Sequence, residues 1–224
     1  MQCTVYQLGL IEYSKAYQLQ TELVRRRLDS DVPNTLLLLE HPPTITIGRF
    51  GKPENILASR TQLEEEGVSL VFTDRGGDVT YHGPGQIIGY PVIDLHKSRI
   101  TIRRYIYKLE EVIINTLREL SLTAYRDATH RGVWIKNEEI AAIGLRISRG
   151  ITMHGFALNV NPDMTHFSLI NPCGFTDRKA ASIASILSRK ITMEEVTERL
   201  IAQFSNVFDA EVIPGYDIFM RSGR

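Results

Sequence analysis

The chain has 224 residues, of which 43% are hydrophobic and 23% charged, and its formal net charge is zero. These proportions are typical of a soluble globular protein rather than a disordered one, and a chain of this length can bury a core without disulfide staples. Zero net charge gives no overall indication of nucleic acid or a membrane surface as a partner, and no stretch approaches the roughly 20 apolar residues of a transmembrane helix.

Two cysteines, Cys3 and Cys173, stand near opposite ends of the chain. Two thiols spaced so far apart do not make a disulfide framework, and a reducing compartment fits them best. The first residues lack the basic segment and apolar run of a signal peptide. We therefore expect a cytoplasmic protein that binds neither nucleic acid nor membrane.

The first half of the chain is predicted to form several strands and one helix. Apolar residues at helical spacing predict the helix over 14–28. A continuous apolar run at 35–39 is typical of a buried strand, and it ends before Pro42 and Pro43, which cannot donate to a strand ladder. Further strands are predicted at 3–10, 44–47, 68–72 and 87–93.

The second half is predicted to contain two long helices separated by strands. Residues 102–120 carry an apolar stripe along one helical face. The last helix begins at a capping box, Thr192 to Glu195, and its buried face is predicted to consist of Val196, Leu200, Phe204 and Val207. Three strands expected to be antiparallel neighbours lie between the helices, at 133–135, 140–147 and 151–160.

These elements predict an α+β fold, or α/β with a mixed sheet, in which the helices pack on one side of the sheet and leave the other side for a site. No linker-like stretch divides the chain, so we predict a single domain over residues 1–224. A smaller C-terminal subregion after residue 161 is compatible with the pattern.

A segment at 75–86 combines four glycines and a proline with several polar side chains. Glycine allows tight turns and close approach of the backbone to a ligand. The spacing fits neither a dinucleotide fingerprint nor a phosphate loop. A structural turn would explain Gly-Pro-Gly alone, but the accompanying polar set favours a binding site. That set is Arg75, Asp78, Thr80, Tyr81 and His82.

The second notable segment is Asn171-Pro172-Cys173-Gly174, which precedes a predicted helix start near Asp177. A thiol close to a helix N-terminus can have its pKa lowered, which makes it a better nucleophile. The alternative is a buried, inert thiol, and we assign that alternative to Cys3, which falls inside a predicted strand.

A third pair of segments, 140–144 and 153–160, alternates apolar with small residues. Two such strands can line an apolar slot with few polar groups, as an acyl chain requires. The six histidines show no spacing typical of a metal site. Only His82 and His154 are favoured as site residues, because they lie in glycine-containing segments.

Together these motifs resemble the lipoyl(octanoyl) transferases, and they occur in that family's order and spacing. The 75–86 segment is highly specific, and its combination with the cysteine motif is more so. The other matching motifs are Leu39-Glu40-His41-Pro42-Pro43, Thr46-Ile47-Gly48-Arg49 and His154-Gly155-Phe156-Ala157-Leu158-Asn159.

The resemblance implies the biotin/lipoate protein ligase fold and transfer of an octanoyl group without ATP, metal or other cofactor. The implied donor is octanoyl-acyl carrier protein, and the implied acceptors are lysines of the lipoyl domains of 2-oxoacid dehydrogenases and of the glycine cleavage H protein. Cys173 is the implied nucleophile. The implied substrate pocket consists of Arg75, Gly76, Gly77, Asp78, Val79, Thr80, Tyr81, His82, Ala142, Ile143, Gly144, Gly155, Phe156 and Ala157.

One position departs from the family pattern. Where the family has a lysine that lowers the pKa of the cysteine, this chain has Glu139. A carboxylate near Cys173 should raise the thiol pKa instead. Glu139 therefore keeps open the alternative of a non-catalytic acyl-binding homologue. A second alternative is an ATP-dependent lipoate or biotin ligase, which is disfavoured by the presence of Cys173 and by the absence of that lysine, on which the lipoate ligases of this fold also rely.

Overall fold

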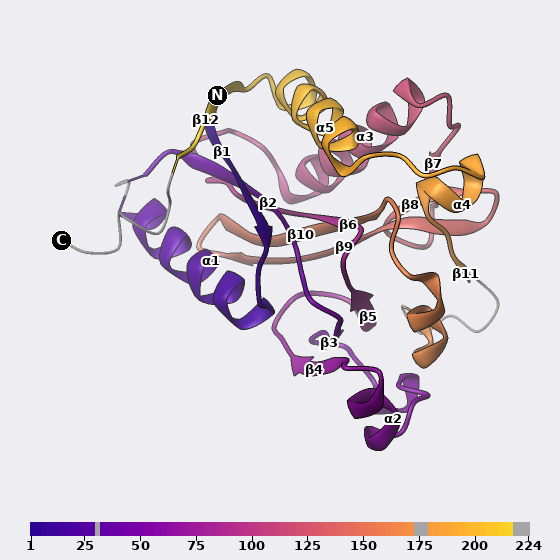
Figure 1. The fold of residues 1–224 in the computed structure, drawn as a ribbon. Coiled ribbons are helices and arrows are strands. Elements are labelled where there is room, and N and C mark those ends of the chain that lie inside the picture. Colours follow the sequence, from indigo (N-terminus) through magenta and orange to yellow (C-terminus); the bar gives the residue numbers. More distant parts are fainter. Residues whose placement is uncertain (30–31, 173–178, 217–224) are drawn as a thin grey trace.

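The computed structural model describes residues 1–29, 32–172 and 179–216. Within them, a nine-stranded sheet forms the centre of the molecule (Figure 1). From one edge to the other its strands are β12 (Glu211–Pro214), β1 (Gln2–Leu10), β2 (Asn34–Glu40), β6 (Gln86–Val92), β10 (Ile151–Asn159), β9 (Glu138–Ser148), β8 (Val133–Ile135) and β7 (Tyr125–Arg126), and β11 (Lys179–Ala180) also pairs with β9.

The sheet is mixed, as the sequence predicted. Strand β1 runs parallel to both β2 and β12, whereas β2, β6, β10, β9 and β8 pair antiparallel. The predicted antiparallel set at 133–135, 140–147 and 151–160 is confirmed as β8, β9 and β10.

Helices cover both faces of this sheet, so the prediction of helices on one side was wrong (Figure 1). Helices α3 (Ile102–Glu119) and α5 (Met193–Phe208) lie on one face, and α1 (Tyr13–Leu28) lies on the other. The reason is visible in β2, where Leu36 and Leu38 join the core under α3 and α5 while Leu37 and Leu39 join the core under α1. A strand that is apolar on both faces needs cover on both faces.

The helix termini follow the sequence closely. Thr101 caps α3 by accepting a hydrogen bond from the Arg104 amide, and Thr192 caps α5 by accepting one from the Glu195 amide. The buried stripe of α5 ends on Phe208, whereas Val207 is only partly buried. Among the described residues, no helix is both long and apolar enough to cross a membrane.

A smaller sheet, in the order β4 (Ser69–Phe72), β3 (Thr44–Ile47) and β5 (Val79–His82), packs beside the α1 face (Figure 1). It has its own apolar cluster, which includes Leu63 of helix α2 (Arg60–Glu65). Strand β5 lies inside the 75–86 segment, where no strand was predicted, and it pairs along the whole of β3. Its burial between two layers stabilises a strand despite the flanking glycines.

Short elements complete the fold. The 3-10 helices η1 (Pro53–Asn55) and η2 (Met164–Leu169) lie near the small sheet, and helix α4 (Ile183–Leu187) precedes α5. The helix predicted to start near Asp177 lies outside the described residues.

Candidate functional site

A narrow cavity of about 50 Å³ lies between the main sheet and the 75–82 segment. Its floor is formed by two cross-strand pairs of small residues, Ala142 with Ala157 and Gly144 with Gly155, on β9 and β10. A Cβ atom added at Gly144 would lie 2.9 Å from the carbonyl oxygen of Gly76. Glycine at 144 therefore lets the 75–82 segment approach the floor closely.

The other wall comes from the glycine-rich segment. Residues 75–78 cross over β9 and are fixed there by a hydrogen bond of 2.8 Å from the Gly76 amide to the Leu145 carbonyl. Beyond them, Thr80 and His82 of β5 line the cavity. Val79 and Tyr81 do not, because alternate side chains of a strand point to opposite faces, and these two join the apolar cluster of the small sheet.

Twelve of the fourteen pocket residues predicted from the sequence thus line one cavity, together with Tyr90 and His154. Tyr90 was missed because it lies in an ordinary apolar strand, β6, whose pairing with β10 is not visible in the sequence. Ile143 and Phe156 also belong to the cavity, although both contact the core beneath α3.

Arg75 stabilises the conformation of this wall. Its buried guanidinium donates from Nε and Nη2 to the Thr46 hydroxyl at 3.1 and 2.9 Å, and from Nη2 to the Thr46 and Asp78 carbonyls at 2.7 and 2.8 Å. It also donates to the Gly76 carbonyl at 3.0 Å. Hydrogen bonds from a charged donor are the strong ones, so Arg75 fixes the path of the glycine-rich backbone.

A chain of polar contacts continues from Thr46 across the cavity wall. The Thr46 hydroxyl lies 3.2 Å from His82 Nε2, and His82 Nδ1 lies 3.3 Å from the Gln86 side-chain oxygen. The Gln86 amide donates to Asn159, whose own amide donates to the Ala181 carbonyl at 2.9 Å. Burial lowers the pKa of His82 well below its usual value, so this imidazole is neutral.

Asp78 makes a second connection from the same segment. Its carboxylate accepts from the Lys52 amide at 2.9 Å and from the Asn55 side chain at 2.6 Å. The Asn55 carbonyl in turn accepts from the Asn171 amide at 2.8 Å. The glycine-rich segment is therefore linked to Asn171 on one side of residues 173–178 and to Ala181 on the other.

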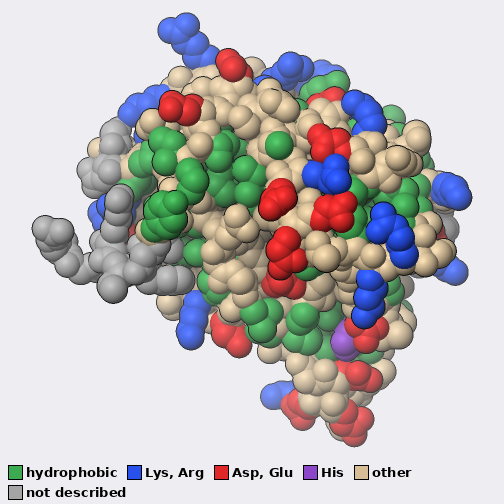
Figure 2. Space-filling view, turned by 45° about the horizontal axis from the view of Figure 1, so that its top comes forward, with side chains coloured by type: hydrophobic (Ala, Val, Ile, Leu, Met, Phe, Trp, Pro, Cys, Tyr) green, Lys and Arg blue, Asp and Glu red, His purple; other side chains and the backbone are tan. Residues whose placement is uncertain are grey.

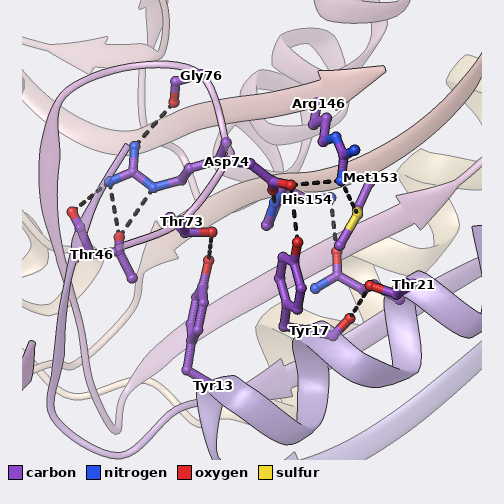
Figure 3. Close-up of polar contacts among 12 residues, drawn as sticks. Tyr13, Tyr17, Thr21, Thr46, Thr73, Asp74, Gly76, Arg146, Met153 and His154 are labelled. Atoms are coloured by element: carbon purple, nitrogen blue, oxygen red, sulfur yellow. Dashed lines mark hydrogen bonds and ion pairs between the residues drawn. The ribbon is translucent and has the colours of Figure 1, made fainter. Parts of the chain in front are cut away.

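At one end of the cavity His154 joins a polar cluster (Figure 3). Its Nε2 lies 2.9 Å from Asp74, which also accepts from the Tyr17 hydroxyl at 2.9 Å and from Arg146 at 2.6 Å. His154 has a left-handed φ of 57°, an uncommon conformation for a non-glycine residue that often marks functional sites. Burial lowers the pKa of His154, although Asp74 opposes that effect.

Of the two cysteines and Glu139, the structure describes only Cys3 and Glu139. The predicted nucleophile, Cys173, lies outside the described residues. Cys3 is fully buried in β1, and this burial raises its pKa to about 12, which makes it inert as a nucleophile at neutral pH. Glu139 is buried on β9, and its carbonyl accepts from the Ala181 amide at 2.9 Å.

The histidines give no metal site in the described part of the chain, where no three His, Cys, Asp or Glu side chains lie close enough to share an ion. His41 is fully buried, with Nδ1 2.7 Å from the Ile11 carbonyl and Nε2 2.8 Å from the Tyr90 hydroxyl. Burial lowers its pKa to about 4.

Comparisons with known proteins agree with this architecture. Residues 12–205 match the lipoyl protein ligase A/B catalytic domain. The chain is 45% identical to an octanoyltransferase of Alkaliphilus metalliredigens, over 95% of this chain and 98% of the relative. It is 47% identical to an octanoyltransferase of Desulforamulus reducens, over 94% of this chain and 93% of that relative.

Two solved structures share the fold at low identity. A lipoate-protein ligase A bound with ATP superimposes with a TM-score of 0.79 and 18% identity, covering 98% of this chain and 90% of that chain. A bi-partite lipoate protein ligase from Thermoplasma acidophilum gives a TM-score of 0.76 and 18% identity, covering 98% of this chain and 88% of that chain. At these identities the likeness shows the fold.

Proposed function

This chain belongs to the lipoyl protein ligase A/B catalytic-domain family, and from that membership we propose that it transfers an octanoyl group through a thioester on Cys173 to a lysine amine of a lipoyl domain. The observation that carries the proposal is its similarity, over more than nine tenths of its length, to relatives that are octanoyltransferases. The protein is an acyltransferase of protein lipoylation.

The chemistry proceeds in two transfers. In the first, the Cys173 thiolate attacks the donor thioester, a carbon–sulfur bond to the enzyme forms, and the donor thiolate leaves. In the second, an uncharged lysine amine attacks the enzyme thioester, a carbon–nitrogen bond forms, the thiolate of Cys173 leaves, and the amine gives up one proton. Thioester exchange followed by aminolysis needs neither ATP nor a metal ion.

The cavity supports the acyl-binding part of this proposal. Its floor of alanine and glycine leaves a narrow slot, and its polar lining residues include Arg75, Thr80 and His82. We assign acyl binding to the twelve predicted residues that line the slot, with Tyr90 and His154 added to them. The links from Asp78 to Asn171 and from His82 to Ala181 support a role for the glycine-rich segment in holding the two flanks of Cys173.

Lipoyl domains are the acceptors. The finer assignments are part of the proposal: octanoyl-acyl carrier protein as donor, and the lipoyl domains of 2-oxoacid dehydrogenases and the glycine cleavage H protein as acceptors. We place the reaction in the cytoplasm, where a reducing environment keeps Cys173 available as a thiol.

The test is transfer to a purified lipoyl domain from octanoyl-acyl carrier protein with no nucleotide present. A mass increase of one octanoyl group on the lipoyl domain supports the transferase. Octanoylation that requires ATP and free octanoate supports the ligase alternative. Octanoate or donor binding with no transfer under either condition supports the non-catalytic alternative, which Glu139 in place of the family lysine keeps open.

A further inference from the structure

The cavity has one end near the flank of Cys173 and one end remote from it. Strand β11, which follows residues 173–178, pairs with Glu138 and Glu139 at the start of β9. His154 pairs with Leu145, six residues further along β9. At about 3.3 Å per residue, Glu139 and Leu145 are roughly 20 Å apart. His154 therefore stands at the remote end.

The floor changes character at this remote end. The small pairs Ala142–Ala157 and Gly144–Gly155 are followed on the same strands by the larger pair Arg146–Met153. The hydrogen bond from Gly76 to Leu145 joins the opposite wall to the floor at the same level. The slot is therefore open along its small residues and closes near Leu145.

A polar group with an unused acceptor stands at this closed end (Figure 3). Because the Asp74 carboxylate can only accept, His154 donates from Nε2, and its Nδ1 is left as an acceptor in the neutral ring. Nδ1 is fully buried and has no hydrogen-bond partner among the described residues. The ring is held between Tyr17 and Tyr90, with centroid separations of 5.9 and 6.1 Å.

We infer that His154, positioned by Asp74, forms the end wall of the acyl slot and limits the chain to about eight carbons. The inference rests on the proposed function and names the residue that sets substrate length. From Ala142 to Leu145 the floor spans about 10 Å. An extended octanoyl chain, with seven carbon–carbon bonds of about 1.5 Å in zigzag, needs roughly 9 Å.

The unpartnered nitrogen adds selectivity to the steric limit. A longer alkyl chain would press a methyl group against the imidazole and leave the buried Nδ1 without a hydrogen-bond partner, which is costly for a polar atom. An octanoyl chain ends before the ring. The same wall should accept a hydroxyl group at the chain end, because a hydroxyl can donate to Nδ1.

The experiment measures the rate of acyl-adduct formation on Cys173 with acyl carrier protein loaded with hexanoyl, octanoyl, decanoyl or dodecanoyl groups. In the wild-type protein the rate should fall beyond octanoyl. In His154→Gly, which removes the ring and tolerates the left-handed φ, the decanoyl-to-octanoyl rate ratio should rise at least tenfold, since each methylene in an apolar pocket discriminates by about 10- to 200-fold. His96→Gly, at an exposed histidine outside the cavity, should keep the wild-type profile.

A second pair of donors isolates the role of Nδ1. Nonanoyl and 8-hydroxyoctanoyl chains have nearly the same size, so their rate ratio reports the hydrogen bond rather than the space. The wild-type protein should favour the hydroxylated chain about tenfold, and His154→Gly should lose that preference. His154→Asn, which also tolerates a left-handed backbone, provides the same comparison if the glycine variant does not fold.

The outcomes separate this inference from the proposed function. If the wild-type protein forms no adduct with any donor, the proposed function fails. If wild-type and variant proteins form the octanoyl adduct but their chain-length profiles and hydroxyl preference are identical, His154 is not the end wall and the inference is overturned.

Discussion

Glu139 stands where β9 meets two neighbouring strands, opposite Trp134 of β8 and Ala180 of β11. This residue is only 6% exposed, and a Cβ atom added at Gly132 would lie 2.8 Å from its carboxylate. Such burial amplifies the effect of a charge on its neighbours. The identity of residue 139 therefore matters for any group close to it.

Replacing Glu139 with lysine is expected to activate the enzyme. If residue 139 lies close to Cys173, exchanging an anion for a cation favours the thiolate, and one pKa unit corresponds to about 1.4 kcal/mol. We expect the pH midpoint of Cys173 alkylation by iodoacetamide to fall by at least about one unit, and transfer to become faster.

The neighbouring residue supplies the control for this change. Glu138→Lys makes the same charge exchange on the opposite side of β9, so it should move the alkylation midpoint less. An unchanged midpoint and unchanged turnover in Glu139→Lys would show that residue 139 does not tune the thiol.

Substituting the two cysteines should have different effects on transfer. Cys173→Ser removes the proposed nucleophile and should abolish transfer, because a hydroxyl is far less reactive as a nucleophile than a thiolate. Cys3→Ser alters a thiol enclosed in the core and should lower stability while transfer stays near the wild-type rate. Measured transfer rates and unfolding free energies give both comparisons, and an equal loss of transfer in both variants would contradict the assignment.

At the scale of elements, the 75–86 segment shows what the sequence could and could not predict. Its glycines and polar residues indicated a binding site. Its strand β5 was not predicted, because a strand among glycines and proline is stabilised by its pairing with β3 rather than by local propensity. For the same reason Val79 and Tyr81 were predicted to line the pocket, whereas strand alternation turns them into the small core.

The segments with regular apolar patterns were predicted well. Residues 151–160 and 102–120 became β10 and α3 with shifts of one residue at one end. The spacing of apolar residues predicts these elements, because it follows from the face that each element buries. The left-handed backbone of His154 and its approach to Asp74 depend on contacts between distant segments, so no local pattern could indicate them.

Substitution of Thr46 tests whether β3 stabilises the cavity wall. Thr46→Val would leave two Arg75 donors and His82 without the hydroxyl that they share. Losing a buried hydrogen-bond partner costs about 1–3 kcal/mol, even though Arg75 Nη2 keeps the Thr46 and Asp78 carbonyls as acceptors, so we expect a loss of stability of that size together with slower transfer. Thr44→Val, on the same strand, removes a hydroxyl whose one hydrogen-bond partner among the described residues is the Pro42 carbonyl. Equal effects of the two variants on transfer would contradict a special role for Thr46.

At the scale of the whole molecule, three buried histidines lie in the interface between the two sheets. The rings of His41 and His82 are 5.8 Å apart, and the Tyr90 ring is a neighbour of both His41, at 5.9 Å, and His154, at 6.1 Å. Burial lowers the pKa of all three. The folded protein therefore holds them neutral, whereas the unfolded chain protonates them below about pH 6.5.

This arrangement predicts acid sensitivity. A histidine with a depressed folded pKa contributes stability above its unfolded pKa, and that stability is lost as pH falls below about 6.5. For His41, whose folded pKa is about 4, the loss between those two values reaches about 3 kcal/mol. Urea unfolding at pH values from 7.5 to 4.5 should show a falling free energy. A constant value over that range would contradict neutral burial.

The surface predicts a modest electrostatic contribution to docking. On the face shown in Figure 2, acidic and basic side chains are interspersed with scattered hydrophobic patches. Arg146 is paired with Asp74, so exposed Arg149 is the better candidate for contacting acidic partner proteins.

Salt should therefore slow transfer between protein substrates. The Debye length falls from about 10 Å at 0.1 M to about 3 Å at 1 M, which screens steering between partners. Arg149→Asn, which tolerates the left-handed backbone at this position, should weaken the salt dependence. A transfer rate that does not change with salt would contradict a docking role for Arg149.

The most direct test of the central claim is the intact mass of the protein after a single incubation with octanoyl-acyl carrier protein, without nucleotide or acceptor. The account predicts one added octanoyl group, located on Cys173 by peptide mapping, removed by hydroxylamine, and transferred when a lipoyl domain is then added. A protein whose mass stays unchanged while it still octanoylates the lipoyl domain would contradict the thioester route. An adduct on Cys3 would contradict the assignment of the nucleophile.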